Sequence, residues 1–129
     1  MNTQPAKKIL IVEDEALTVN LLRDNLISEG FSTLEVRNGK EGLKVALKEH
    51  PDLILLDIIM PVMDGITMLK KIRSDAWGKN AKIIILTNLS DTEKVSEAMD
   101  RGTYDYLIKS DWKLEDVATK IRERLEWSE

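Results

Sequence analysis

The chain has 129 residues, no cysteine and a formal net charge of −4 at pH 7. This length suits a single domain, and the lack of cysteine excludes disulfides and thiolate metal sites. The acidic balance disfavours direct nucleic-acid binding, and no apolar run approaches the roughly 18 residues that a membrane span needs. Because no apolar signal region precedes the first predicted strand, we also expect a cytoplasmic protein.

Strand-like and helix-like segments alternate along the whole chain. Four short apolar runs are typical of strands buried on both faces of a parallel sheet, and a fifth segment alternates like a half-exposed edge strand. Apolar residues at helical spacing, with Gly or Asp near the segment ends, predict five helices. The expected elements are strand 7–12, helix 15–29, strand 31–36, helix 40–49, strand 52–56, a helix after 64–65, strand 81–86, a helix between 91 and 102, strand 104–108 and helix 114–126.

The apolar stripes of the helices predict which side chains face the sheet. The expected inward residues of the first two helices are Leu17, Leu21, Leu22 and Leu26, followed by Leu43, Ala46 and Leu47.

Two aromatic residues have structural explanations. His50, the only histidine, ends the second helix and is expected to be solvated or to cap it. Trp77 is expected to pack in a loop.

Strict alternation of strand and helix demands right-handed crossovers, with helices on both faces of the sheet. The predicted fold is therefore α/β: a doubly wound, five-stranded parallel sheet of order 2-1-3-4-5 with five helices, as in flavodoxin. We expect all 129 residues to belong to this one domain. In such a sheet the ligand crevice lies outside the carboxyl ends of strands 1 and 3.

Polar residues stand where four of the predicted strands end. Glu13 and Asp14 follow the first strand, Asp57 ends the third, Thr87 the fourth and Lys109 the fifth. Because the carboxyl ends of parallel strands meet at one edge of the sheet, these side chains are expected to converge. Each alone has a structural explanation, such as acids at a helix start, but together they predict a site.

Three converging carboxylates repel one another unless a cation lies among them. An all-oxygen ligand set without His or Cys favours Mg²⁺, or Mn²⁺, over zinc. Lys109 would add a positive charge and Thr87 a hydroxyl donor, which are the groups that phosphoryl transfer uses. A carboxylate can be the nucleophile that forms an aspartyl phosphate, and Asp57 is the best-placed candidate.

The motifs resemble those of bacterial response-regulator receiver domains over nearly the whole chain. They are Glu13-Asp14, the run Asp57-x-x-Met60-Pro61-x-Met63-Asp64-Gly65, Thr87, and Tyr106-Leu107-Ile108-Lys109. The resemblance implies that Asp57 accepts a phosphoryl group from a histidine kinase or a histidine phosphotransfer protein. It implies direct Mg²⁺ ligation by Asp14, Asp57 and the backbone carbonyl of Ile59, with Glu13 acting mainly through water.

The resemblance also implies a switch. Thr87 and Lys109 would contact the phosphoryl group, and Tyr106 would reorient as Thr87 moves. The face formed by the fourth helix, fifth strand and fifth helix would then bind a downstream protein or a second copy.

The resemblance also bears on the lifetime of the phosphoryl group. It implies that Ile59 and Leu89 occupy the two variable positions that flank the path of hydrolytic water, and both are apolar. We therefore expect slow self-dephosphorylation and no enzymatic activity on a separate substrate.

One position departs from the family pattern. A cis proline usually follows the lysine, whereas this chain has Ser110. A non-proline cis bond costs roughly 3 to 4 kcal/mol, which leaves the geometry of the Lys109–Ser110 bond open.

Two other functions share these residues. An aspartyl-nucleophile phosphohydrolase usually carries a second acid two residues after the nucleophile, where this chain has Ile59. A phosphorylation-independent interaction module of the same fold remains the other alternative. Because the last predicted helix ends close to Glu129, we expect no output domain in this chain. It is either a stand-alone receiver, which Met1 and the final helix favour, or part of a longer protein.

Overall fold

The computed structural model describes residues 6–87, 96, 105–108 and 113–126. Their strands form one parallel sheet of order β2-β1-β3-β4-β5, which confirms the predicted topology. The strands are β1 (Lys8–Val12), β2 (Ser32–Val36), β3 (Leu53–Asp57), β4 (Ile83–Thr87) and β5 (Asp105–Ile108).

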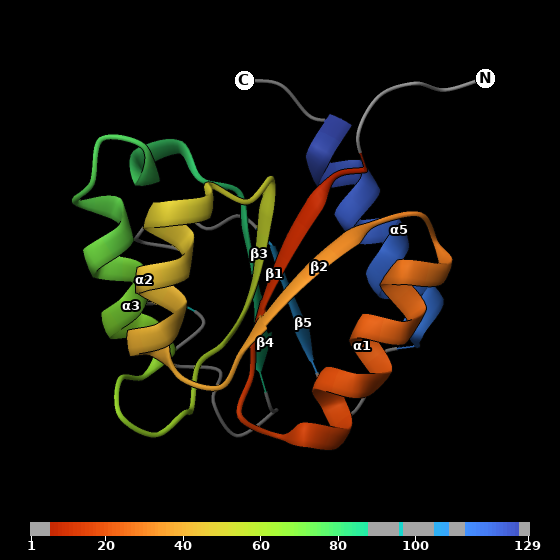
Figure 1. The fold of residues 1–129 in the computed structure, drawn as a ribbon, viewed down its shortest axis with the longest axis horizontal. Coiled ribbons are helices and arrows are strands. Elements are labelled where there is room, and N and C mark those ends of the chain that lie inside the picture. Colours follow the sequence, from red (N-terminus) through yellow and green to blue (C-terminus); the bar gives the residue numbers. More distant parts are fainter. Residues whose placement is uncertain (1–5, 88–95, 97–104, 109–112, 127–129) are drawn as a thin grey trace.

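Helices cover both faces of this sheet. Figure 1 shows α2 and α3 on one side of the strands and α1 and α5 on the other. The fourth helix that we expected, between residues 91 and 102, falls almost wholly outside the described residues. The described helices are α1 (Ala16–Ser28), α2 (Gly39–Glu49), α3 (Gly65–Arg73) and α5 (Leu114–Glu126), with a short 3₁₀ turn, η1 (Gly78–Asn80).

Each central strand contributes side chains to two separate cores. Along β1, Leu10 and Val12 pack with α2 and α3, whereas Ile9 and Ile11 pack with α1 and α5. This division follows from the two-residue period of a strand, which sends successive side chains to opposite faces. Strand β2 lies at the edge and is only partly buried, as its alternating sequence predicted.

The predicted inward faces of the first two helices were partly wrong. Leu17 and Leu21 are 67% and 48% exposed, and Leu47 is 36% exposed. In α1 the buried residues are instead Thr18, Val19, Leu22 and Leu26. Thr18 can be buried because its hydroxyl donates a hydrogen bond to the Glu15 carboxylate. The buried stripe of α1 therefore keeps Leu22 and Leu26 but has Thr18 and Val19 in place of Leu17 and Leu21.

Hydrogen bonds and left-handed residues cap the helix ends. The Asp64 carboxylate accepts a 2.8 Å hydrogen bond from the Thr67 amide at the start of α3, where a turn and helix start were predicted. Gly30 follows α1 with φ 97°, which only glycine adopts easily. His50 ends α2 in the left-handed conformation and its N–H donates to the Ala46 carbonyl. The capping role expected for His50 is thus confirmed.

The cap of α2 gives a stability prediction. The Asn38 side-chain oxygen accepts a 2.8 Å hydrogen bond from the Glu41 amide. Asn38→Ala should lower the free energy of unfolding by about 1 kcal/mol, since the amide loses its protein partner. Urea denaturation would measure this loss, and Asn38→Asp should restore most of it. Equal stability of the alanine and aspartate variants would contradict the assigned cap.

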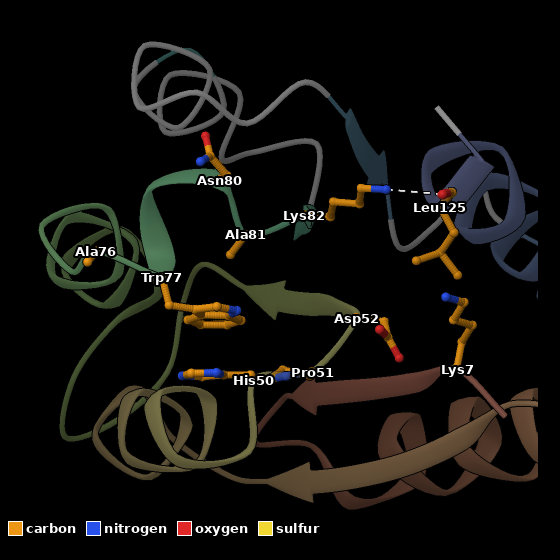
Figure 2. Close-up of a pocket in the computed structure, with 10 residues that line it drawn as sticks. All are labelled: Lys7, His50, Pro51, Asp52, Ala76, Trp77, Asn80, Ala81, Lys82 and Leu125. Carbon is orange, nitrogen blue, oxygen red and sulfur yellow. Dashed lines mark hydrogen bonds between the residues drawn. The ribbon is translucent and has the colours of Figure 1, made fainter. Parts of the chain in front are cut away.

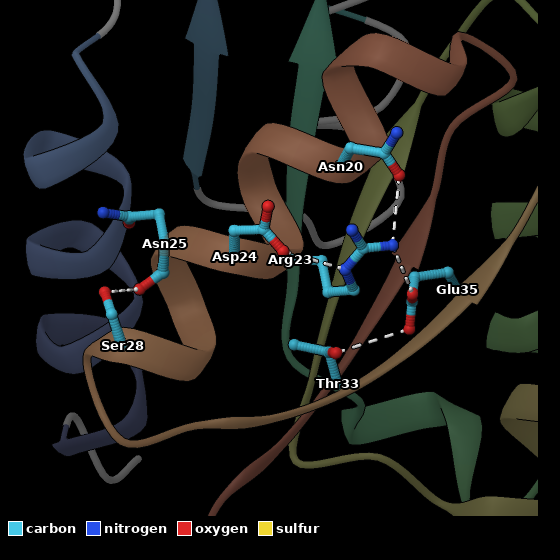
Figure 3. A network of polar contacts seen from close by, with 7 residues as sticks. All are labelled: Asn20, Arg23, Asp24, Asn25, Ser28, Thr33 and Glu35. Carbon is cyan, nitrogen blue, oxygen red and sulfur yellow. Dashed lines mark hydrogen bonds and ion pairs between the residues drawn. The ribbon is translucent and has the colours of Figure 1, made fainter.

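A polar network ties α1 to the edge strand β2. The Arg23 guanidinium donates to Asn20 at 3.0 Å and to the neighbouring Asp24 at 3.1 Å, and it lies 3.6 Å from a Glu35 carboxylate oxygen (Figure 3). The Thr33 hydroxyl donates to the same carboxylate at 3.3 Å. Because these groups are at least partly exposed, each pair adds little to stability, but together they hold β2 against the helix.

Candidate metal centre

Three carboxylates meet at the carboxyl edge of the sheet. Val12 pairs with Leu56 in the β1–β3 ladder, so the residues that follow, Glu13 and Asp57, end adjacent strands. One carboxylate oxygen from each of Glu13, Asp14 and Asp57 lies within 4.8 Å of the others. The structure thus brings together the three acids that the sequence singled out.

The local backbone holds these acids in place. The Glu13 amide donates to the Val36 carbonyl at 3.1 Å, which continues the β1–β2 pairing one residue further. The Glu13 carboxylate accepts from the Glu15 amide at 3.2 Å, and that of Asp57 accepts from the Ile59 amide at 3.4 Å. Glu13 is fully buried and Asp57 is 4% exposed, whereas Asp14 is exposed. Two acids therefore line the base of the site and one its rim.

This donor set fits a hard divalent cation. Two buried carboxylates and an exposed third, so close together, repel one another unless a positive charge lies among them. All the available donors are oxygens, which Mg²⁺ prefers, and the exposed Asp14 leaves room for the waters that Mg²⁺ retains.

The loop after Asp57 is closely packed. The Gly65 amide donates to the Ile58 carbonyl at 2.8 Å, and a Cβ on Gly65 would lie 2.2 Å from the Asp57 carbonyl oxygen. Only glycine allows α3 to begin this close to the end of β3. The start of α3 therefore packs directly against the end of β3 that carries Asp57.

The remaining expected site residues are only partly described. Thr87 is 1% exposed and ends β4, the neighbour of β3 in the sheet, so it lies on the same edge as Asp57. Tyr106 lies on β5 and is 43% exposed, and Ile59 is 48% exposed. Lys109, Leu89 and the Lys109–Ser110 bond lie outside the described residues.

A pocket of about 490 Å³ lies elsewhere, beside the amino ends of β3 and β4. Figure 2 shows His50 and Trp77 stacked at one side of it, with ring centroids 4.5 Å apart. Lys82 donates to the Leu125 carbonyl at 3.0 Å on the other side. None of the three carboxylates lines this pocket, so it is separate from the candidate metal centre. Trp77 packs in a loop, as the sequence suggested.

A search of the described helices for a membrane-spanning segment finds none.

Comparison with known families agrees with the geometry at the sheet edge. The response regulator receiver domain matches residues 9–122, which includes every strand of the sheet except the first residue of β1. The chain belongs to the response-regulator receiver family. The resemblance to this family that the sequence motifs indicated is therefore confirmed over almost the whole chain.

The chain is similar to curated response regulators and to a sporulation phosphotransferase. It is 33% identical over 119 residues to the DNA-binding response regulator MtrA of Mycobacterium tuberculosis, covering 92% of this chain and 50% of that protein. It is 35% identical over 103 residues to sporulation initiation phosphotransferase F of Bacillus subtilis, covering 80% of this chain and 82% of that protein. The chain therefore spans about half the length of the MtrA relatives.

One solved structure bears on the metal. The receiver domain of a sensor histidine kinase from Pseudomonas aeruginosa PAO1, described with a magnesium ion coordinated in the active-site cleft, superposes with a TM-score of 0.86 at 26% identity. The match covers 95% of this chain and 99% of that one.

Two residues near the site were not predicted from the sequence. Gly39, at the start of α2, donates to the Met63 carbonyl at 2.9 Å, and Val62 has a φ of 69°. The Asn38-Gly39 pair signals a helix start but says nothing about a contact with a loop 24 residues further on. No sequence signal marks Val62, since β-branched residues rarely adopt positive φ.

Proposed function

We propose that this receiver domain is switched by transfer of a phosphoryl group from a phosphohistidine to Asp57. The donor would be a histidine kinase or a histidine phosphotransfer protein, and the transfer would take place in the cytoplasm. An Asp57 oxygen attacks the phosphorus, the phosphorus–nitrogen bond breaks, and the imidazole leaves with the bonding electron pair. The product is an aspartyl phosphate on this chain. The observation that carries the proposal is a nearly buried Asp57 among two further carboxylates at the sheet edge.

The chain's own residues would prepare this transfer. Asp14, Asp57 and the Ile59 carbonyl would hold Mg²⁺ directly, with Glu13 acting mainly through water. The bound cation supplies charge neutralisation at the phosphoryl oxygens. Thr87 would donate its hydroxyl and Lys109 its ammonium to those oxygens. The magnesium in the related Pseudomonas receiver supports this assignment.

The output would be a shift between two packings of one face. Once Thr87 moves toward the phosphoryl group, the exposed ring of Tyr106 can fill the space that Thr87 has left. This would change the face that the expected fourth helix forms with β5 and α5, and that face would bind a downstream protein or a second copy. Unchanged backbone NMR shifts in β5 and α5 on adding beryllofluoride, a phosphoryl mimic, would rule out this route.

Intact mass spectrometry with acetyl phosphate and Mg²⁺ separates the possible functions. The receiver should gain one phosphoryl group, and Asp57→Ala should gain none. Asp52→Ala is a matched control, because Asp52 is the exposed acid just before the opposite end of the same strand. No adduct on the parent would favour a phosphorylation-independent module. Steady turnover of a phosphoester would favour a phosphohydrolase.

The lifetime of the aspartyl phosphate gives a further prediction. Water must attack the phosphorus in line with the Asp57 oxygen, and Ile59 and Leu89 would flank its path without offering hydrogen bonds. Ile59→Asn combined with Leu89→Glu should therefore speed dephosphorylation by about a hundredfold, the lower end of what a positioned acid–base side chain usually contributes. The decay of the phosphorylated mass in Mg²⁺ buffer measures this rate. Equal decay in variant and parent would mean that these side chains do not control water access.

A further inference from the structure

The loop between β3 and α3, residues 58–64, is anchored at both ends by backbone hydrogen bonds. At its base the Gly65 amide donates to the Ile58 carbonyl at 2.8 Å. At its far end the Gly39 amide, from the start of α2, donates to the Met63 carbonyl at 2.9 Å. Met60 and Met63 also pack against the core beneath α2 and α3. The loop that carries Ile59 is therefore held by α2 as well as by β3 and α3.

The loop contains a strained turn between these anchors. The Met63 amide donates to the Pro61 carbonyl at 2.8 Å, and Val62 between them has a φ of 69°. A β-branched residue with positive φ is a steric outlier, and such strain persists only where the surroundings hold it. Val62 is 76% exposed, so its own side chain contributes little packing. The flanking backbone contacts must supply the restraint.

Gly39 is closely fitted to this loop. It is buried, and a Cβ there would lie 2.3 Å from the Met63 carbonyl oxygen and 2.9 Å from its carbonyl carbon. Both are backbone atoms, so a methyl group cannot be accommodated by a side-chain rotation. Any side chain at position 39 must displace either the start of α2 or the loop itself.

We propose that Gly39 is a positioning residue of the metal site. Its amide and its lack of a side chain hold Met63, and through the short loop they place the Ile59 carbonyl where it can ligate the cation beside Asp57. This inference rests on the proposed function, since it takes Ile59 as a ligand. It makes the first residue of α2, which contributes no ligand, a determinant of Mg²⁺ affinity.

Two glycine-to-alanine variants in the same helix test the inference. Gly39→Ala should weaken Mg²⁺ binding by about tenfold, which is the lower end of the usual loss of metal affinity when an outer-shell partner is disturbed. Calorimetric titration measures this affinity. Gly42→Ala is the matched control, because its Cβ would lie 2.8 Å from the Met68 sulfur and 3.0 Å from a Val12 methyl, which are side-chain atoms of the core. Gly42→Ala should lower stability yet bind Mg²⁺ within about twofold of the parent, as no ligand is displaced.

A second measurement uses the parent protein and does not depend on how the variants fold. Coupling between two events is reciprocal, so if the Gly39–Met63 bond favours metal binding, bound Mg²⁺ must favour that bond by the same factor. Hydrogen exchange of the Gly39 amide should therefore slow by about tenfold at saturating Mg²⁺. The His50 amide, which donates to Ala46 at the other end of α2, should be unaffected.

The outcomes distinguish this inference from the proposed function. A parent that takes up no Mg²⁺ overturns the metal assignment and the inference with it. Normal Mg²⁺ binding by both the parent and Gly39→Ala overturns the inference alone, as does equal exchange of the Gly39 amide with and without Mg²⁺. Selective weakening in Gly39→Ala, with slowed exchange in the parent, supports both.

Discussion

Gly65→Ala should both destabilise the protein and abolish phosphorylation of Asp57. The added Cβ would lie 2.2 Å from the Asp57 carbonyl oxygen and 2.9 Å from the Ile58 Cα, so β3 and α3 must move apart. Overpacking of this kind typically costs about 1 to 3 kcal/mol, and we expect the upper end because backbone atoms are in contact. Urea denaturation gives the loss of stability, and intact mass after acetyl phosphate gives the loss of acceptor activity.

Gly78→Ala provides the matched control for that experiment. Its Cβ would lie 1.9 Å from the Ile72 carbonyl oxygen, an equally severe backbone clash, but between α3 and η1 rather than beside Asp57. We expect a similar loss of stability, of about 3 kcal/mol, with phosphorylation retained at temperatures where the variant is folded. If both variants lose phosphorylation alike, the effect of Gly65 is global instability rather than displacement of Asp57.

Asp14→Asn should weaken Mg²⁺ binding by about a hundredfold, because the charge of a direct ligand is lost. This loss is at least as large as the usual loss of metal affinity when an outer-shell partner is mutated. The same change should stabilise the metal-free protein, since one of three mutually repelling carboxylates is neutralised. Calorimetric titration and urea denaturation without metal measure the two effects. Their opposite signs are what separate a metal ligand from an ordinary surface acid.

Asp52→Asn is the control for the affinity measurement, because it removes the same charge at the opposite end of β3. It should leave Mg²⁺ affinity unchanged. In the parent, binding should also weaken as the pH falls, because protonated carboxylates no longer ligate. Wild-type Mg²⁺ affinity in Asp14→Asn would show that the ligand assignment is wrong.

The sheet and the acidic site were predictable from the sequence for one physical reason. A strand buried on both faces must be apolar throughout, so β3 and β4 appear as unbroken apolar runs whose polar ends mark the sheet edge. The strict alternation of strands and helices then leaves few topologies, and the order β2-β1-β3-β4-β5 brings Glu13 beside Asp57.

Side-chain facing and long-range backbone contacts were harder to predict. In α1, Leu17 and Leu21 form a helical stripe as regular as Leu22 and Leu26, and only the packing of α1 against the sheet decides which is buried. Burial of Thr18 depends on its hydrogen bond to Glu15, which apolar periodicity does not reveal. The contact between Gly39 and Met63 joins the start of α2 to the loop after β3 through backbone atoms, so it leaves no pattern in the side chains.

We propose that Asp57 itself carries the phosphoryl group. Reduction of the phosphorylated protein with tritiated borohydride converts an aspartyl phosphate to labelled homoserine, and peptide mapping then locates the label. We predict label at position 57 alone, dependent on Mg²⁺ and absent from Asp57→Ala. Label at Asp14 or at any other residue, or equal labelling of Asp57→Ala, would contradict it.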